Sequence, residues 1–259
     1  MIKKLLSGVV VALIVLAGLS IVSIFVLDGI AQSVIQTGGS EGLGVDIKLD
    51  SAHVGFFTKK TSVKGIKIKN PESFQSEETP YLLTIEDVRI TFNIFQMFEK
   101  KVIIPSVTAT GVVLDLQQYN NAKSNIEVVI NHISQDETPD SAHHEPPFII
   151  ETLTISNVKV IARGQFTVLG SKPITAPIKT DIVLHGVGGD GDAEVAIETI
   201  TTAITQAIMK ELMDNPVDGI SKVVLSSAIK TVDNIVKEIL GVAGGIVDFL
   251  TGKKGENNN

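Results

Sequence analysis

The chain contains no cysteine and no tryptophan, and only two of its 259 residues are tyrosine. The lack of cysteine excludes disulfide bonds, zinc–thiolate centres and cysteine nucleophiles. With so few large aromatic side chains, a stacking surface for carbohydrate or nucleic-acid bases is not expected. Basic charge is also scarce: the formal net charge is -7 and the pI is about 5.3. Because nucleic-acid-binding surfaces are usually basic, we expect no nucleic-acid partner.

Motifs of known catalytic and cofactor sites are also missing. The sequence has no G-x-S-x-G or H-E-x-x-H pattern, and its carboxylates are scattered. The glycine run at residues 186–191 lacks both the Gly-Lys-Ser/Thr of a phosphate loop and the G-x-G-x-x-G order. His143 and His144 are adjacent, but no third ligand lies at a fixed spacing from them. We therefore expect no catalytic residues, no metal, no cofactor and no enzyme activity.

The N-terminus holds the longest apolar run. Residues 5–27 contain no charge and reach roughly 35 Å as a helix, enough for a hydrocarbon core of about 30 Å. Lys3 and Lys4 precede the run and Asp28 follows it, so residues 1–30 are predicted to be a cytoplasmic start and a single membrane anchor. The alternative is a signal peptide cleaved after Gly29-Ile30-Ala31, although signal h-regions are usually about 7–15 residues. A mature protein that begins near Gln32 would support cleavage.

Two segments are near copies of each other. The segment Ile103–Leu114 aligns with Ile149–Val160, and a partial third copy lies at Ile85–Thr91. In both full copies apolar residues alternate, and the alternation then slips by one residue at Gly111 or Asn157. Glycine and asparagine tolerate positive φ, so we expect a bulge or sharp bend at the same place in each unit. Repeated strand–bend–strand units build an elongated sheet rather than a catalytic pocket.

The rest of the chain divides by composition. Residues 31–134 form the first part of a β region, in which Leu82–Ile94 alternates strictly and Ser124 and Glu127 are spaced as a capping box. Residues 135–147 are acidic, proline-rich and almost free of apolar side chains, so they are predicted to be a mobile linker and the first site of proteolysis. Residues 148–192 form the second part of the β region.

Two amphipathic helices and a polar tail are predicted for residues 193–259. In the second helix, apolar residues follow a heptad-like spacing from Leu225 to Leu250. This pattern favours packing on another helix or a sheet face. A helix lying on a membrane surface is the alternative, although its lysines are balanced by acids. The 225–250 face is also a candidate contact for an envelope protein partner. The predicted fold class is therefore mainly β with C-terminal helices (α+β), built on an elongated, curved antiparallel sheet.

The order of these parts, over residues 1–212, resembles the AsmA-like family of bacterial envelope proteins. The resemblance rests on the anchor, on short apolar motifs and on their succession. The motifs are Val45–Gly55, Val63–Phe74 with its Asn70-Pro71, Ile85–Ile90, Lys101–Pro105, Ser124-Asn125-Ile126 and the helix after Gly191. Ser73 stands where the family usually has glycine, and Ile126 where leucine is usual.

This resemblance implies a protein anchored by residues 5–27 in the bacterial inner membrane, with its bulk in the periplasm. It also implies a β groove that binds phospholipid and a role in phospholipid transport or outer-membrane maintenance. From the alternation we select candidate groove residues on one apolar face: Val88, Ile90, Phe92, Ile94, Val107, Leu153 and Ile155. The alternative is a structural or adaptor protein of the envelope, in which residues 193–250 cover the same face as a closed core.

Overall fold

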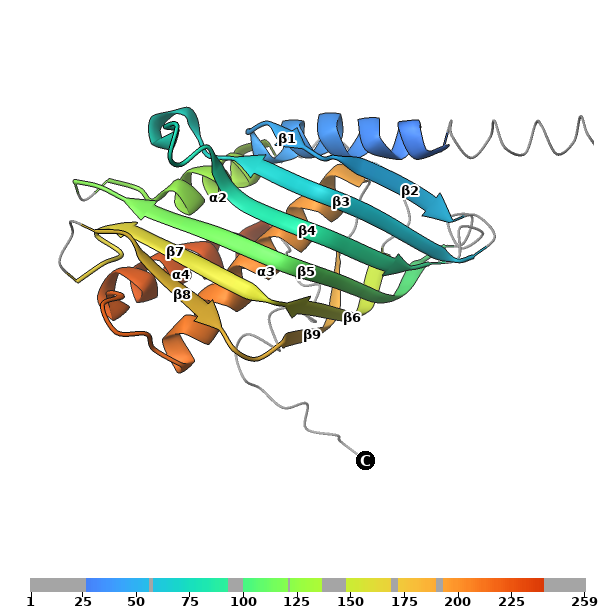
Figure 1. Cartoon of the computed structure of the whole chain (residues 1–259). Coiled ribbons are helices and arrows are strands. Elements are labelled where there is room, and N and C mark those ends of the chain that lie inside the picture. The colour runs from blue at the N-terminus through green and yellow to red at the C-terminus, as the bar shows by residue number, and fades with distance from the viewer. Residues whose placement is uncertain are drawn as a thin grey trace, which may run out of the picture.

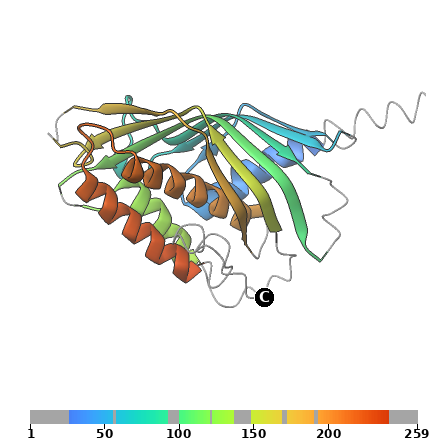
Figure 2. The same cartoon turned by 90° about the horizontal axis from the view of Figure 1, so that it is seen from below.

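The computed structural model describes residues 27–55, 58–92, 100–120, 122–136, 148–168, 172–189 and 193–239. In this part of the chain, nine strands form one curved sheet, and helices lie on one of its faces (Figures 1 and 2). The first helix covers residues 27–43. It is followed by β1 (Ile47–Lys48), β2 (Ser51–Gly55), β3 (Lys60–Lys69), η1 (Glu72–Phe74), β4 (Tyr81–Thr91), β5 (Val102–Gln118), α2 (Asn125–Asp136), β6 (Phe148–Ser156), β7 (Val158–Gly164), β8 (Ile174–Ile178), β9 (Ile182–Gly189), α3 (Ala193–Asp214) and α4 (Lys222–Ile239).

The predicted fold class is confirmed in its main features, a predominantly β protein with C-terminal helices, but the sheet is mixed rather than antiparallel. The strands from β1 to β5 pair antiparallel, whereas β5 pairs in parallel with β6 and β7. The reason lies in the connection after β5, which contains α2 and continues to residue 147. A connection of this length returns the chain to the end of the sheet where β5 begins, so that the next strand can run parallel to β5.

The two predicted repeats are the strands of this parallel pair. They lie side by side with the alignment read from the sequence, from Ile103 beside Ile149 to Leu114 beside Val160. Gly111 has φ +70° and Asn157 has φ +52°, as predicted for the slip in each repeat. Pairing continues on both sides without an extra residue, so the feature is a bend and not a bulge.

This bend extends across neighbouring strands as what we call the first crease, the row Gly65, Glu86, Gly111 and Asn157. In the strand register both glycines face Glu86, and Gly65 also has positive φ, at +63°. A positive φ inside a strand exchanges the two faces, so the buried apolar residues change parity there. Val107 and Ala109 are buried before the crease on β5, and Val112 and Leu114 after it.

Gly111→Ala is expected to destabilise the protein by about 1–2 kcal/mol, because a left-handed conformation is unfavourable for alanine. A Cβ atom would also lie 2.4 Å from the Glu86 carboxyl group, which would have to move. Asn157→Gly is the matched control at the equivalent position, and we expect it to be neutral or slightly stabilising. Chemical denaturation would measure both. Equal stability of Gly111→Ala and the wild type would contradict a strained crease.

A second crease lies nearer the start of β5 and was not predicted. Here Pro105, Glu151 and Gly186 face one another on β5, β6 and β9, and Gly186 has φ +69°. Ile150 and Leu153 are both fully buried, although they are three positions apart and Glu151 between them is exposed. The sheet therefore bends twice, which gives it the curvature seen in Figure 2.

The C-terminal helices fill the concave side of the sheet. α3 contacts β9 and α4, and α4 also contacts α2. Residues 201–209 of α3 are all buried, so the prediction of an amphipathic helix is wrong for this stretch. The reason is that α3 is enclosed between the sheet and α4. α4 does behave as predicted over its first turns, where Leu225 and Val232 are fully buried.

The capping box predicted from Ser124 and Glu127 is present at the start of α2. The Ser124 backbone N–H and its hydroxyl group donate to Glu127 Oε2, at 2.6 and 2.7 Å, and the Glu127 N–H donates back to Ser124 Oγ at 3.3 Å. These bonds satisfy backbone donors that the first turn of a helix leaves free. Residues 137–147, most of the predicted linker, lie outside the described residues.

The helix over residues 27–43 is attached to the edge of the sheet through Asp28. Its Oδ1 accepts a hydrogen bond from the backbone N–H of Val54 at 2.7 Å, and Oδ2 lies 3.0 Å from His53 Nδ1. We call this end of the sheet, where β2 ends and β3 begins, the Asp28 end. Thr91, Val102 and Phe148 also lie at this end, and the opposite end carries η1 (Figure 1).

Candidate apolar binding site

The structure brings most of the candidate groove residues together on the concave face. Val88 lies on β4, Val107 lies on the neighbouring strand β5, and Leu153 and Ile155 lie on β6. In the register Ile90 pairs with Val107, and Val107 pairs with Leu153, so these side chains form a continuous row. Ile94 lies outside the described residues.

Burial divides this row into two parts. Leu153 and Ile155 are 0% exposed, and Val88 and Val107 are also buried in the core that includes α3. Ile90 and Phe92, which are closer to the Asp28 end, are only half-buried. The middle of the predicted groove is therefore filled by protein. At the Asp28 end the apolar face is half-buried on β4 and β5, whereas Phe148 and Ile150 on β6 are buried there as well.

Other apolar residues at the Asp28 end have the same intermediate exposure. Val102 and Ile104 lie on β5 before the second crease and pack at the margin of the core. Sequence alternation alone placed Val107 on the candidate face but missed these two, because the unpredicted second crease exchanges the faces between Ile104 and Val107. The signal was present as Ile103-Ile104 and Ile149-Ile150, two adjacent apolar pairs that break strict alternation.

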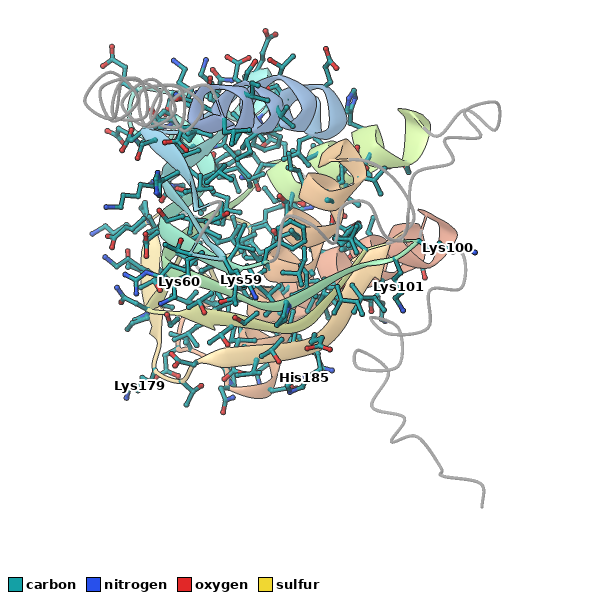
Figure 3. All side chains as sticks on the ribbon, turned by 90° about the vertical axis from the view of Figure 1, so that its right-hand side faces the viewer. Lys59, Lys60, Lys100, Lys101, Lys179 and His185 are labelled. Atoms are coloured by element: carbon teal, nitrogen blue, oxygen red, sulfur yellow. The ribbon has the colours of Figure 1, made fainter. Side chains whose placement is uncertain are left out.

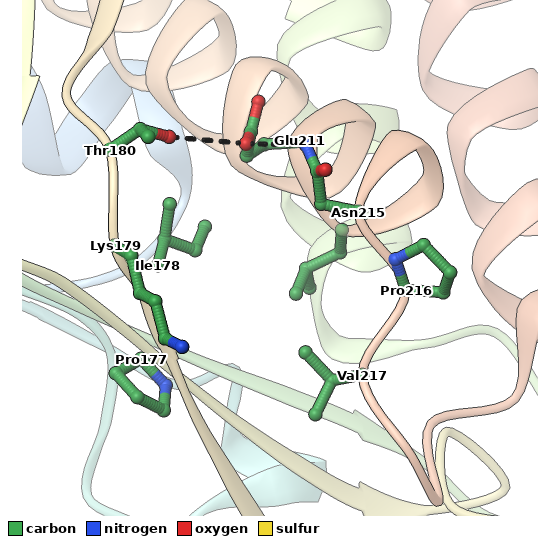
Figure 4. A pocket seen from close by; sticks show the side chains of 9 residues that line it. Pro177, Ile178, Lys179, Thr180, Glu211, Asn215, Pro216 and Val217 are labelled. Carbon is green, nitrogen blue, oxygen red and sulfur yellow. Dashed lines mark hydrogen bonds between the residues drawn. The ribbon is translucent and has the colours of Figure 1, made fainter.

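A separate cleft lies where the outer strand is interrupted between β8 and β9. Between β8 and β9, residues 179–181 of the outer strand lie opposite only two residues of the neighbouring strand, Ser156 and Asn157. The extra residue makes this a bulge, and it lies at the end of the first crease. The cleft has a volume of about 510 Å³ (Figure 4). Its lining comes from β8, the β8–β9 connection, α3 and the segment after α3: Pro177, Ile178, Lys179, Thr180, Glu211, Leu212, Asn215, Pro216 and Val217.

Three polar side chains of this cleft are linked by hydrogen bonds. Thr180 Oγ1 donates to Glu211 Oε1 at 3.3 Å, and Asn215 Nδ2 donates to the same oxygen at 2.8 Å (Figure 4). The apolar walls of Ile178, Leu212 and Val217 would accommodate a small apolar group. The cleft has no triad-like arrangement among its lining residues, and it is formed by the β8–β9 break rather than by the candidate groove residues.

Motifs on which the family resemblance rests meet at the end opposite Asp28. Asn125 Nδ2 donates to Asn70 Oδ1 at 2.8 Å and to the carbonyl oxygen of Asp115 at 2.7 Å, and both asparagines are completely buried. The Asn70 side chain also donates to the Thr79 carbonyl oxygen at 2.9 Å. These asparagines join the β3–β4 connection, β5 and α2, so their role in this structure is architectural.

One buried ion pair lies beside this network. Arg163 Nε donates to both carboxylate oxygens of Asp115, at 3.2 and 2.9 Å, and the two side chains are 14% and 8% exposed. Burial raises the pKa of Asp115, and the bond to Arg163 opposes this effect. Because the guanidinium group already holds the carboxylate, this pair is suited to structure and not to proton transfer.

The remaining candidates concern metals, partners and the membrane. Within the described ranges, no group of three His, Asp or Glu side chains is arranged to hold a metal ion. His143 and His144 lie outside those ranges. On the 225–250 face, Leu225 and Val232 are buried inside the protein. No helix among the described residues is long and apolar enough to cross a membrane, and residues 5–26 of the predicted anchor are not among them.

Comparisons of the chain with protein-family models, with curated proteins and with solved structures found no match.

Proposed function

We propose that this protein is a membrane-anchored, periplasmic envelope protein that binds phospholipid acyl chains at the Asp28 end of its apolar sheet face. In this role it takes part in phospholipid transport or in maintenance of the outer membrane, as its resemblance to the AsmA-like family implies. One observation carries the proposal. Asp28 directly follows the apolar run of residues 5–27 and is hydrogen-bonded to β2, so no free linker separates that run from the sheet.

The exposure of the apolar face supports this location for lipid. Ile90, Phe92, Val102 and Ile104 are half-buried at the Asp28 end, whereas Leu153 and Ile155 farther along are fully buried. An acyl chain that leaves the membrane would first meet these half-buried side chains, and contact with them would remove further apolar surface from water. Lipid binding in this proposal is limited to the Asp28 end, because α3 already fills the middle of the concave side.

A photo-crosslinking amino acid at Ile90 tests the proposal directly in the full-length protein in membranes. We expect covalent phospholipid adducts from position 90, detected by mass spectrometry of the purified protein. Position 89 is the matched control, since Arg89 is the neighbouring residue on the outer face and is 77% exposed in its side chain. Little or no adduct is expected there.

The second candidate is a structural or adaptor protein of the envelope without a lipid site. The complete burial of Leu153 and Ile155 beneath the helices favours it, since a closed core is what such a protein requires. Crosslinks from position 90 that reach only residues of this chain, and never phospholipid, would support this candidate and exclude the first.

A further inference from the structure

Two separate pairs of lysines lie at the Asp28 end of the sheet. Lys59 and Lys60 lie where β2 turns into β3, and Lys100 and Lys101 lie immediately before β5 (Figure 3). All four are exposed. Within the described part of the chain, none of them forms an ion pair with a carboxylate, whereas Lys67 and Lys69 farther along β3 pair with Asp50 and Asp46.

This concentration of positive charge is opposite in sign to the charge of the whole protein. Residues 58–61 and 93–102 contain these four lysines and one acidic residue, Glu99, in a chain with a net charge of -7. At the opposite end, the β3–β4 connection exposes Glu72, Glu77 and Glu78. The β2–β3 turn is therefore basic and the β3–β4 connection is acidic, at opposite ends of β3.

The N-terminal segment lies at the same end of the sheet as these lysines. The helix over residues 27–43 begins at the same end as the lysines, and the bonds from Asp28 to His53 and Val54 hold it beside the β2–β3 turn. If residues 5–27 cross the membrane, the four lysines face the surface of that membrane. Anionic phospholipid head groups attract basic residues there, over a distance comparable with the Debye length.

We infer that Lys59, Lys60, Lys100 and Lys101 form a rim that binds anionic phospholipid head groups and holds the Asp28 end of the sheet against the membrane. This inference rests on the proposed membrane anchor and adds a ligand class, the anionic head group. In the sequence, the segments that join β2 to β3 and β4 to β5 also contain five of the ten phenylalanines, Phe56, Phe57, Phe92, Phe95 and Phe98. Basic and apolar side chains together are typical of segments that lie at a membrane interface.

The absence of cysteine allows a single fluorescent label to report the contact. Full-length Thr58→Cys, labelled and reconstituted into vesicles, would be compared with Glu77→Cys at the opposite end. Vesicles of phosphatidylcholine alone, and of phosphatidylcholine with phosphatidylglycerol, would carry a quencher on a minority of head groups. We expect several-fold stronger quenching at position 58 in the vesicles with phosphatidylglycerol, reduced by high salt, and little quenching at position 77 in either.

Replacing all four lysines by glutamine in the Thr58→Cys protein is expected to abolish the difference between the two kinds of vesicle. Because the four side chains are exposed, this variant should keep the thermal unfolding transition of its parent. Quenching at position 58 that depends neither on phosphatidylglycerol nor on the lysines would overturn the inference.

The two proposals can fail separately. Lysine-dependent quenching without lipid adducts at position 90 would leave the rim intact and exclude acyl-chain binding. Lipid adducts at position 90 with charge-independent quenching would exclude the rim alone. Protein that does not float with vesicles of either composition would contradict the anchor and overturn both proposals.

Discussion

Replacing Leu153 by aspartate is expected to unfold the protein at neutral pH. Leu153 is 0% exposed and lies between Val107 on β5 and Leu184 on β9, within the core covered by α3. An aspartate there would bury an unpaired charge in addition to losing the leucine contacts. A cost of several kcal/mol is comparable with the whole stability of an ordinary domain, which is about 5–15 kcal/mol.

The adjacent substitution Thr154→Asp is the matched control for Leu153→Asp. Thr154 is half-buried and has the opposite parity on β6, so we expect a change within about 1 kcal/mol. Circular dichroism during thermal unfolding would compare the two variants with the wild type. A cooperative transition close to that of the wild type in Leu153→Asp would mean that the middle of the concave face is open to solvent.

Replacing Arg163 by methionine is expected to destabilise the protein by about 3 kcal/mol at pH 7, because it leaves the buried Asp115 carboxylate without its partner. Methionine retains much of the apolar volume of the arginine side chain. The double variant Asp115→Asn/Arg163→Met is the control, since it removes both charges. We expect it to recover most of the loss, which equilibrium denaturation would measure.

The pH dependence gives Arg163→Met a distinctive signature. Burial raises the pKa of Asp115 in the folded protein, so the folded state binds a proton more readily than the unfolded chain does. For a raised carboxyl pKa, the free energy of unfolding falls as pH rises from the ordinary value of 3.8 through the folded-state pKa. Without the guanidinium group this pKa should rise further. The difference between Arg163→Met and the wild type should therefore be smaller near pH 4 than at pH 7. An equal difference at both values would contradict this account.

The sequence alone predicted the features that individual strands encode locally. The alignment of the two repeats anticipated the register of β5 with β6 and β7, and Gly111 and Asn157 have the positive φ that the slip in alternation required. Ser124 and Glu127 form the expected capping box. Each of these features depends on residues within one segment or on a direct comparison of two similar segments.

Features that depend on how distant segments assemble were not predictable in the same way. Alternation in the segments around Val107 and Leu153 shows that both strands have an apolar face, but it does not show whether the strands run parallel. Nor does it show whether α3 covers that face. The amphipathic pattern expected for α3 was wrong over residues 201–209, because this stretch is enclosed by protein and needs no exposed polar face. Its buried threonines accompany apolar neighbours.

The parallel pairing of the two repeats has a consequence for folding of the newly made chain. β5 cannot gain its second neighbour until residues 148–164 have been synthesised, which leaves its backbone donors and acceptors unpaired in the meantime. Contacts between such distant segments form slowly, and exposed strand edges can associate with other chains. Because β6 and β7 nearly duplicate the sequence of β5, the unpaired edge of β5 in one incomplete chain can pair with either repeat of another chain. Newly made chains that are close together can therefore exchange their C-terminal halves. Early formation of α2 would limit this exchange, because it would keep the second repeat close to β5 of its own chain.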